Sequence, residues 1–170
     1  MTIRQATEKD FSAMQALFAG ARERMRSGGN PDQWGERKPY PDDTHEDISL
    51  GRAYLLVDPD GAAGERILGT FVFYVGEDPN YRQIDGAWLD DAPYGVIHRI
   101  AGDGRTKGIL KAAVEFARER SAILRAASLR IDTHERNLPM RHLLQKYGFQ
   151  ECGVIRLADG SPRLAYQILF

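Results

Sequence analysis

Apolar residues recur at intervals of three and four between residues 11 and 25, which is the spacing of one face of an α-helix. The stripe consists of Phe11, Met14, Leu17, Phe18, Ala21 and Met25. Thr7 and Asp10 both precede this stripe, and Asp10 lies three residues after Thr7. The pair therefore predicts a capping box at the start of the helix. We expect a short strand at residues 2–6 before the helix, and we expect the apolar stripe to lie in the core.

The pattern then changes to short apolar runs that are bounded by turn residues. Residues 53–58 and 67–75 predict two strands of a hairpin, since the segment from Asp58 to Gly64 is rich in Asp, Pro and Gly. A short acidic helix is expected before them, at about residues 42–50. A further apolar strand is predicted at residues 94–101.

The C-terminal half returns to the helical period. A helix at about residues 107–120 carries Ile109, Leu110, Ala113, Val114 and Ala117 on one face. A strand at about residues 127–132 follows, so this part predicts a β-α-β crossover. Strands at about residues 150–158 and 162–169 flank Asp159-Gly160, which is a hairpin-turn signal. The order of elements predicts an α/β (α+β) protein with a mixed sheet.

Composition narrows the class of protein. A chain of 170 residues with 42% hydrophobic and 28% charged residues is typical of a globular protein, and we expect one domain over residues 1–170. The N-terminal residues lack the apolar core of a signal peptide, and no apolar run is long enough to span a bilayer. A cytoplasmic location without a membrane partner is therefore expected. The single Cys152 cannot form an internal disulfide, which agrees with a reducing compartment.

Charge and histidine placement exclude two further classes of site. A net charge of -1 gives no overall attraction to nucleic acid, so no nucleic-acid partner is expected and any anion site must be local. His45, His98, His134 and His142 fall on separate predicted elements, so no metal site is expected.

The segment Gly104-Arg-Thr-Lys-Gly108 lies between the predicted strand at 94–101 and the following helix. A glycine turn that leads directly into a helix aims unpaired backbone N–H groups, at the positive end of the helix dipole, toward an anion. Arg105 and Lys107 add positive charge, so the loop favours a pyrophosphate site. The alternative is an ordinary turn whose cations are solvated. A dinucleotide site is disfavoured, because the glycine spacing misses G-x-G-x-x-G by one residue.

A second segment with a recognisable plan runs from Leu129 to Phe149. It reads as a strand, a helix cap, a short helix and a stop. Asn137 is the expected N-cap, Pro139 falls in the first turn, and Gly148 supplies the left-handed C-terminal cap.

Together these two segments resemble the GNAT superfamily of acyl-CoA-dependent N-acetyltransferases. The family's pyrophosphate loop, Gln/Arg-x-x-Gly-x-Gly/Ala, reads here as Arg105-x-x-Gly108-x-Leu110. The family's second element falls on Asn137, Met140, Leu143, Leu144, Gly148 and Phe149. The resemblance covers about residues 94–158, and it implies a mixed, largely antiparallel central sheet with helices on both faces.

The resemblance also implies a cofactor and the residues that bind it. The cofactor is acetyl-CoA or a related acyl-CoA. The backbone N–H groups of about Ile100–Gly102 are expected to stabilise the tetrahedral oxyanion. The expected cofactor-binding residues are Ile100, Ala101, Gly102, Gly104, Arg105, Thr106, Lys107, Gly108, Ile109, Asn137 and Arg141.

The catalytic base and acid are less defined. His98 is the first candidate for the base, because it lies on the strand that should run past the thioester and imidazole titrates near neutral pH. A hydrogen-bonded core histidine is the alternative. His134 is the second candidate, and Asp85 or Glu135 could act through water. The family often uses a tyrosine acid at the position of Leu144, so a catalytically silent acyl-CoA binding module is a second hypothesis.

The substrate implied by the resemblance is a primary amine on a small molecule or a peptide. Trp34, Tyr40 and Trp88, with Tyr94, are candidates for the walls of a substrate pocket. Arg99 is a candidate for contact with phosphate or with a substrate carboxylate, and a surface salt bridge is its alternative. The sequence does not determine the oligomeric state, and a homodimer is one of the options.

Overall fold

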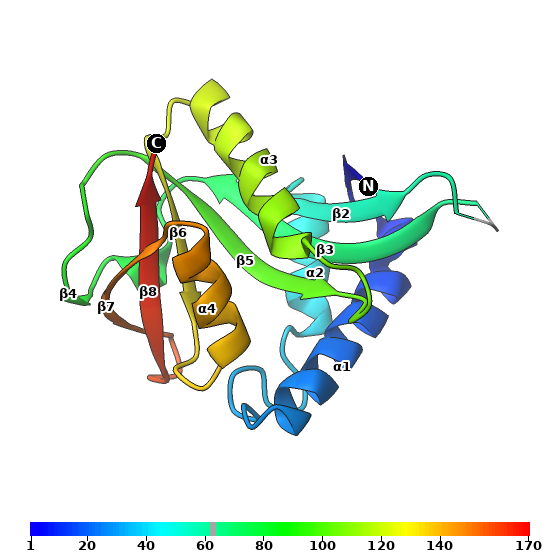
Figure 1. The fold of residues 1–170 in the computed structure, drawn as a ribbon, viewed down its shortest axis with the longest axis horizontal. Helices are drawn as coiled ribbons and strands as arrows, with labels where there is room; N and C mark the ends of the chain where they lie inside the picture. Colours follow the sequence, from blue (N-terminus) through cyan, green and yellow to red (C-terminus); the bar gives the residue numbers. More distant parts are fainter. Residues whose placement is uncertain (62–63) are drawn as a thin grey trace. The chain divides into compact units, whose positions relative to one another are not determined.

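The computed structural model describes residues 1–61 and 64–170 (Figure 1). Within these residues the strands form one mixed sheet of eight strands in the order β1-β2-β3-β5-β6-β8-β7-β4. The strands are β1 (Thr2–Gln5), β2 (Ala53–Asp58), β3 (Arg66–Val75), β4 (Asp85–Gly86), β5 (Tyr94–Gly102), β6 (Ser128–Thr133), β7 (Gln150–Arg156) and β8 (Pro162–Leu169). The helices are α1 (Phe11–Ser27), α2 (Pro41–Ser49), α3 (Ile109–Ile123) and α4 (Leu138–Lys146), with 3-10 turns η1 (Glu8–Asp10) and η2 (Pro79–Tyr81).

The chain divides into two compact units. The first consists of Met1–Phe73 and Arg99–Ala113, and the second of Tyr74–His98 and Val114–Phe170. Strand β5 and helix α3 each contribute residues to both units. The expectation of one domain over residues 1–170 stays a prediction.

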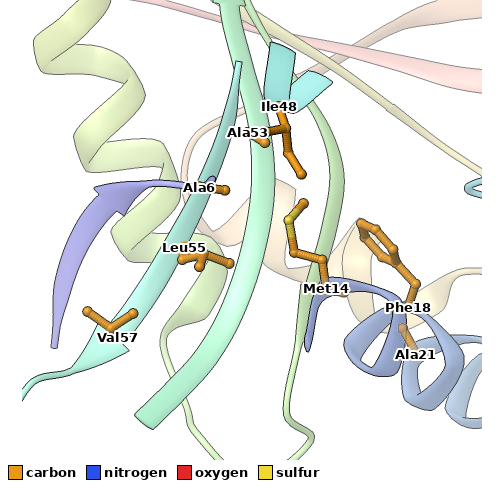
Figure 2. Packing of buried hydrophobic residues seen from close by; sticks show 9 residues of the cluster. Ala6, Met14, Phe18, Ala21, Ile48, Ala53, Leu55 and Val57 are labelled. Carbon is orange, nitrogen blue, oxygen red and sulfur yellow. The ribbon is translucent and has the colours of Figure 1, made fainter. Parts of the chain in front are cut away.

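The first unit packs two helices against an antiparallel ribbon. β2 pairs with β1 on one side and with β3 on the other, both antiparallel, so the predicted hairpin is confirmed. Figure 2 shows Met14 and Phe18 of α1 and Ile48 of α2 in the same cluster as Leu55 of β2. Met14, Phe18 and Leu55 are at most 1% exposed, which confirms the predicted apolar stripe as core.

Side-chain contacts hold the start of α1 against β1. The N–H of Thr7 donates to Oδ2 of Asp10 at 2.8 Å, which is one of the two hydrogen bonds of the predicted capping box. The Oγ1 of Thr7 donates to the same oxygen at 3.0 Å. Arg4 of β1 adds two donors to the same carboxylate, at 2.8 and 2.9 Å. The carboxylate thereby ties the first strand to the first helix.

The second unit contains the crossover and the C-terminal hairpin. β5 and β6 are parallel, with pairs from Tyr94 opposite Ser128 to Val96 opposite Arg130, and α3 connects them, as predicted. β6 pairs with β8 and β8 pairs with β7, both antiparallel. Helix α4 is drawn beside β8 in Figure 1, and Nε of Arg141 donates to the Tyr166 hydroxyl of that strand at 3.4 Å.

The two ends of α4 follow the sequence prediction. Oδ1 of Asn137 accepts a hydrogen bond from the N–H of Met140 at 3.3 Å, and Pro139 lies in the first turn. Gly148 has a φ of 87°, so it provides the left-handed cap that ends the helix.

Two details differ from the prediction. The segment between β3 and β5, for which the sequence analysis predicted no helix or strand, contains η2 and the short strand β4, which pairs with β7. Asp78 starts η2 by accepting the N–H of Asn80, which is a local turn that hydrophobic spacing does not show. Helix α3 begins at Ile109 rather than at about residue 107, because Gly108 has a φ of 83°. Ala62 and Ala63 of the predicted turn lie outside the described residues.

We expect Asp10→Ala to lower the free energy of unfolding by about 1 kcal/mol at pH 7, because a helix cap is lost. Hydrogen bonds from Arg4, opposed by burial and aided by Thr7, lower the pKa of Asp10 to about 2. An unfolded aspartate titrates near 3.9, so the stability that this group contributes is present above about pH 4 and is lost as the pH falls toward 2. Urea unfolding at pH 7 and pH 2.5 measures both values.

The matched control is Glu119→Ala, which removes an exposed carboxylate from α3. Its effect on the free energy of unfolding should be small at both pH values. An Asp10→Ala cost that is the same at both pH values would contradict the role of the ionised carboxylate.

Candidate active site

The predicted anion loop lies in the first unit, where β5 ends and α3 begins. Gly104 and Gly108 have φ values of 79° and 83°, which L side chains adopt only with strain. The two glycines let the chain turn and enter α3 at Ile109. Because the first N–H groups of a helix have no partner within the helix, the start of α3 offers donors to an anion.

Asp103 changes what the loop itself offers. Its Oδ1 accepts the N–H groups of Arg105 and Thr106, at 2.9 and 2.7 Å, and its Oδ2 accepts the Thr106 hydroxyl at 3.0 Å. Burial acts to raise the pKa of Asp103, but these hydrogen bonds outweigh it and lower the pKa. The expectation of unpaired N–H groups is therefore wrong at Arg105 and Thr106, because a neighbouring carboxylate already binds them.

Arg24 of α1 is a cation of this loop that the sequence analysis missed. Its Nη2 donates to the carbonyl of Gly102 at 2.5 Å. A Cβ on Gly104 would lie 2.9 Å from Nη1 of the same guanidinium. Arg24 therefore joins Arg105 and Lys107 as a positive charge at the loop. Arg24 is far from the loop in sequence, so no local pattern could have indicated it.

Arg99 distorts β5 locally and pairs with two carboxylates of α2. Its φ of 50° departs from extended geometry, so the two-residue alternation of a strand fails at this point. Its guanidinium pairs with the buried Asp47, and its Nη2 lies 3.8 Å from Oδ1 of Asp43. Arg99 thus forms a salt bridge, but with a buried carboxylate and not at the surface as the alternative had it. Its contact with phosphate or with a substrate carboxylate stays a prediction.

The three residues after Arg99, Ile100–Gly102, complete β5. Ala101 is buried with the first unit's core, and the N–H of Asp103 donates to the carbonyl of Leu68 at 2.8 Å. The expected oxyanion role of the Ile100–Gly102 N–H groups stays a prediction.

His98 lies in a cluster of acids and tyrosines in the second unit. Nε2 of His98 is 2.6 Å from Oδ2 of Asp78, and Nδ1 is 3.6 Å from Oδ1 of Asp132. The ring also lies beside the rings of Tyr74 and Tyr81, with centroids 6.3 and 5.7 Å away. His98 was predicted as a base, and the structure adds two carboxylates that hydrophobic spacing could not identify.

Asp78 is the most constrained member of the cluster. The Tyr74 hydroxyl donates to its Oδ2 at 2.8 Å, and its own N–H donates to the Tyr94 hydroxyl at 3.1 Å. Burial acts to raise the pKa of Asp78, but the hydrogen bond and charge of His98, with donors from Tyr74 and Asn80, lower it to about 2. The Asp78 carboxylate is therefore ionised at neutral pH.

The other predicted residues of the second unit gather between β6 and α4. Nδ1 of His134 accepts the N–H of Arg136 at 3.2 Å. Nη1 of Arg141 donates to the carbonyl of Glu135 at 3.0 Å, and its Nη2 lies 3.8 Å from the Glu151 carboxylate. With Asn137 at the cap of α4, the structure brings these predicted residues into one connection.

Leu144 is a core residue of α4. Its exposed fraction is 0%. The leucine therefore packs in the core at the position where the family often has the hydroxyl of a tyrosine.

The predicted aromatic residues fall into two groups. Trp34 and Tyr40 line a cavity of about 300 Å³ in the first unit, together with Asp32, Gly35, Glu36, Arg37 and Lys38. Trp88 belongs to the second unit, where its Nε1 donates to the carbonyl of Tyr81 at 3.0 Å. The buried Arg130 lies over the rings of Trp88 and Tyr94, at 4.2 and 3.8 Å from their centroids.

Over residues 1–61 and 64–170, no group of three or more His, Cys, Asp and Glu side chains could hold a metal ion. Among the helices of the same residues, none has both the length and the hydropathy that crossing a bilayer requires.

Comparison with known proteins identifies the class of this fold. Residues 1–150 match the family model of the acetyltransferase (GNAT) domain. A GNAT family acetyltransferase structure from Streptococcus agalactiae is 31% identical, with a TM-score of 0.81 over 99% of this chain and 95% of that one. A Staphylococcus aureus structure described as a putative acetyltransferase is 23% identical, with a TM-score of 0.72 over 99% of both chains.

A chain of the NatC complex, solved with Gag peptide and CoA, is 14% identical, with a TM-score of 0.69 over 99% of this chain and 98% of that one. A search of curated proteins finds no match. The fold is thus that of an acyl-CoA-dependent acetyltransferase. The chain belongs to the GNAT acetyltransferase family.

Leu144→Tyr, which introduces the residue that the family often has, should destabilise the protein by about 1–3 kcal/mol because it overpacks a full core. Thermal and urea unfolding measure this cost. The matched control is Leu138→Tyr, at a residue of the same helix that is 65% exposed and should tolerate the ring. Equal stability of the two variants would show that position 144 has room for a tyrosine.

Proposed function

We propose that this protein transfers an acetyl or related acyl group from acyl-CoA to a primary amine. The observation that carries the proposal is the turn into α3, where Gly104 and Gly108 take left-handed φ values beside three cations. A helix N-terminus with adjacent positive charge suits the pyrophosphate of CoA. The CoA-bound relative with the same fold supports this choice of cofactor.

The reaction sets three chemical requirements. The amine must lose a proton before it attacks the thioester carbon, and His98 is the proposed base, with His134 as the second candidate. The tetrahedral oxyanion needs donors, which we assign to the backbone N–H groups of Ile100–Gly102. The departing thiolate then needs a proton, and Leu144 cannot supply it.

A second function, acyl-CoA binding without turnover, is favoured by one observation. Leu144 is fully buried where the family often has a tyrosine acid. Amines carry a second proton that can reach the thiolate, so loss of the tyrosine does not by itself prevent transfer. The amine acceptor, on a small molecule or on a peptide, is left to experiment.

Gly108→Glu should weaken acetyl-CoA binding about tenfold or more, which is about 1.4 kcal/mol, because a carboxylate then faces the pyrophosphate. Within the described residues, a Cβ on Gly108 has no heavy atom within 4 Å, so a side chain can start there without a clash. The control Gly108→Ala carries the same backbone strain without the charge. Calorimetric titration with acetyl-CoA and with NAD gives the affinities.

Equal acetyl-CoA affinity of the two Gly108 variants would remove the loop from the cofactor site. Binding of NAD in place of acetyl-CoA by the parent protein would overturn the acyltransferase proposal itself.

His98→Gln should reduce amine-dependent release of CoA thiol about a hundredfold, which is the usual contribution of a general base. The control is His142→Gln, at an exposed position of α4, and it should keep the parent rate. A parent protein that binds acetyl-CoA and releases no thiol with any amine of a broad panel would establish the silent binding function. A full rate in His98→Gln would transfer the role of base to His134.

A further inference from the structure

The two ring nitrogens of His98 lie in different environments. Nε2 is within a short hydrogen bond of Asp78, at 2.6 Å, whereas the 3.6 Å from Nδ1 to Asp132 is too long for a direct hydrogen bond. The exposed fraction of the side chain rises from 5% at Asp78 to 11% at Asp132 and 21% at His98. Of these three side chains, the histidine is the one that a ligand reaches most easily.

The partners of Asp78 determine which nitrogen carries a proton. An ionised carboxylate only accepts hydrogen bonds, and Oδ2 of Asp78 accepts from Tyr74 as well as from Nε2. Oδ1 accepts the N–H of Asn80 at 2.8 Å, so the carboxylate cannot rotate without losing donors. Nε2 therefore carries hydrogen, and in the neutral ring Nδ1 holds the lone pair.

Asp132 places a second negative charge on the lone-pair side of the ring. The hydroxyl of the buried Tyr81 donates to its Oδ1 at 2.8 Å, which fixes the oxygen that faces Nδ1. The charge of the buried Arg163 of β8 interacts with Asp132 and with Asp159. The groups around His98 are thus two carboxylates, Asp78 and Asp132, and two tyrosines, Tyr74 and Tyr81.

We propose that Asp78 is a positioning residue that holds the Nε2–H tautomer of His98, and that Asp132 binds the ammonium group of a cationic amine substrate beside Nδ1. This inference rests on the proposed function and adds to it the charge of the substrate and the proton path. One ammonium proton passes to Nδ1, and the N–H electron pair stays on the amine nitrogen. That pair forms the bond to the thioester carbon, and the C–S bond breaks.

The remaining protons balance the step. The second proton that the nitrogen loses goes to the thiolate, which leaves as CoA thiol. The proton on Nδ1 is stabilised by Asp132 until it passes to solvent. The net reaction converts an ammonium and an acyl-CoA into an amide, CoA thiol and one proton.

The first test is nitrogen-15 NMR of the imidazole rings in the protein without ligand, with the His98 signals assigned by His98→Gln. We expect the Nε2–H tautomer in the parent and in Tyr74→Phe, which keeps the Asp78–His98 bond. In Asp78→Asn we expect a mixture of tautomers. An Nδ1–H tautomer in the parent, or no change in Asp78→Asn, overturns the role of Asp78.

The second test compares kinetics with two kinds of amine. For an alkylamine, which is an ammonium at pH 7, Asp132→Asn should raise KM about tenfold or more, and Asp78→Asn should lower kcat about a hundredfold. For an aniline, which is neutral at pH 7, the KM of Asp132→Asn should stay near the parent value. The control Glu77→Gln removes an adjacent carboxylate whose side chain is 74% exposed, and it should match the parent.

The outcomes separate this inference from the proposed function. Failure of the parent to bind acetyl-CoA in calorimetry removes the proposed function, and this proposal with it. Parent turnover that is unchanged in Asp78→Asn, or an Asp132→Asn loss that is equal for both amines, overturns this proposal alone. Circular dichroism melting identifies a variant that fails to fold. If one of the two aspartate variants fails to fold, the kinetics of the other one test the proposal.

Discussion

A carboxylate that leaves water must find donors inside the protein, and this constraint organises both units. Asp10, Asp47 and Asp78 are each less than 9% exposed, and each is satisfied by a basic side chain. Asp10 ties β1 to α1, and Asp47 ties α2 to Arg99. Asp78 starts η2 and holds His98. Since removing one partner leaves a buried charge uncompensated, each pair fixes the elements that it joins.

The same constraint explains why the anion loop is not simply a row of free N–H groups. Asp103 is a built-in acceptor for the amides of Arg105 and Thr106, so the loop keeps its shape without any ligand. Positive charge then comes from side chains, one of them Arg24 of α1. Shape and charge are thus supplied by different residues, and a substitution can change one of them without the other.

The sequence predicts the features that depend on residues close together along the chain. The apolar stripe of α1, the Asn137 cap and the Gly148 stop were all predicted, because each is a pattern within one or two helical turns. Membership of the GNAT family was predicted from two such local patterns, and the match over residues 1–150 confirms it. The roles of the predicted site residues stay predictions.

The missed features are contacts between residues that are distant along the chain. Arg24 meets Gly102, Asp78 meets His98, and Tyr81 meets Asp132. In the sequence, Arg24, Asp78, Tyr81 and Asp132 are ordinary charged or aromatic residues with no periodic signal. Only the folded backbone brings them together, which is why the two acids beside His98 could not be predicted.

The two tryptophans of the chain give each unit its own optical reporter. Trp34 belongs to the first unit, where its ring meets the edge of Phe18 at a centroid distance of 5.7 Å. Trp88 belongs to the second, where the guanidinium of Arg130 lies over its ring. An indole against a hydrocarbon core and an indole beneath a cation have different electrostatic surroundings. Fluorescence of variants that keep only one of the two tryptophans can therefore follow the unfolding of either unit separately.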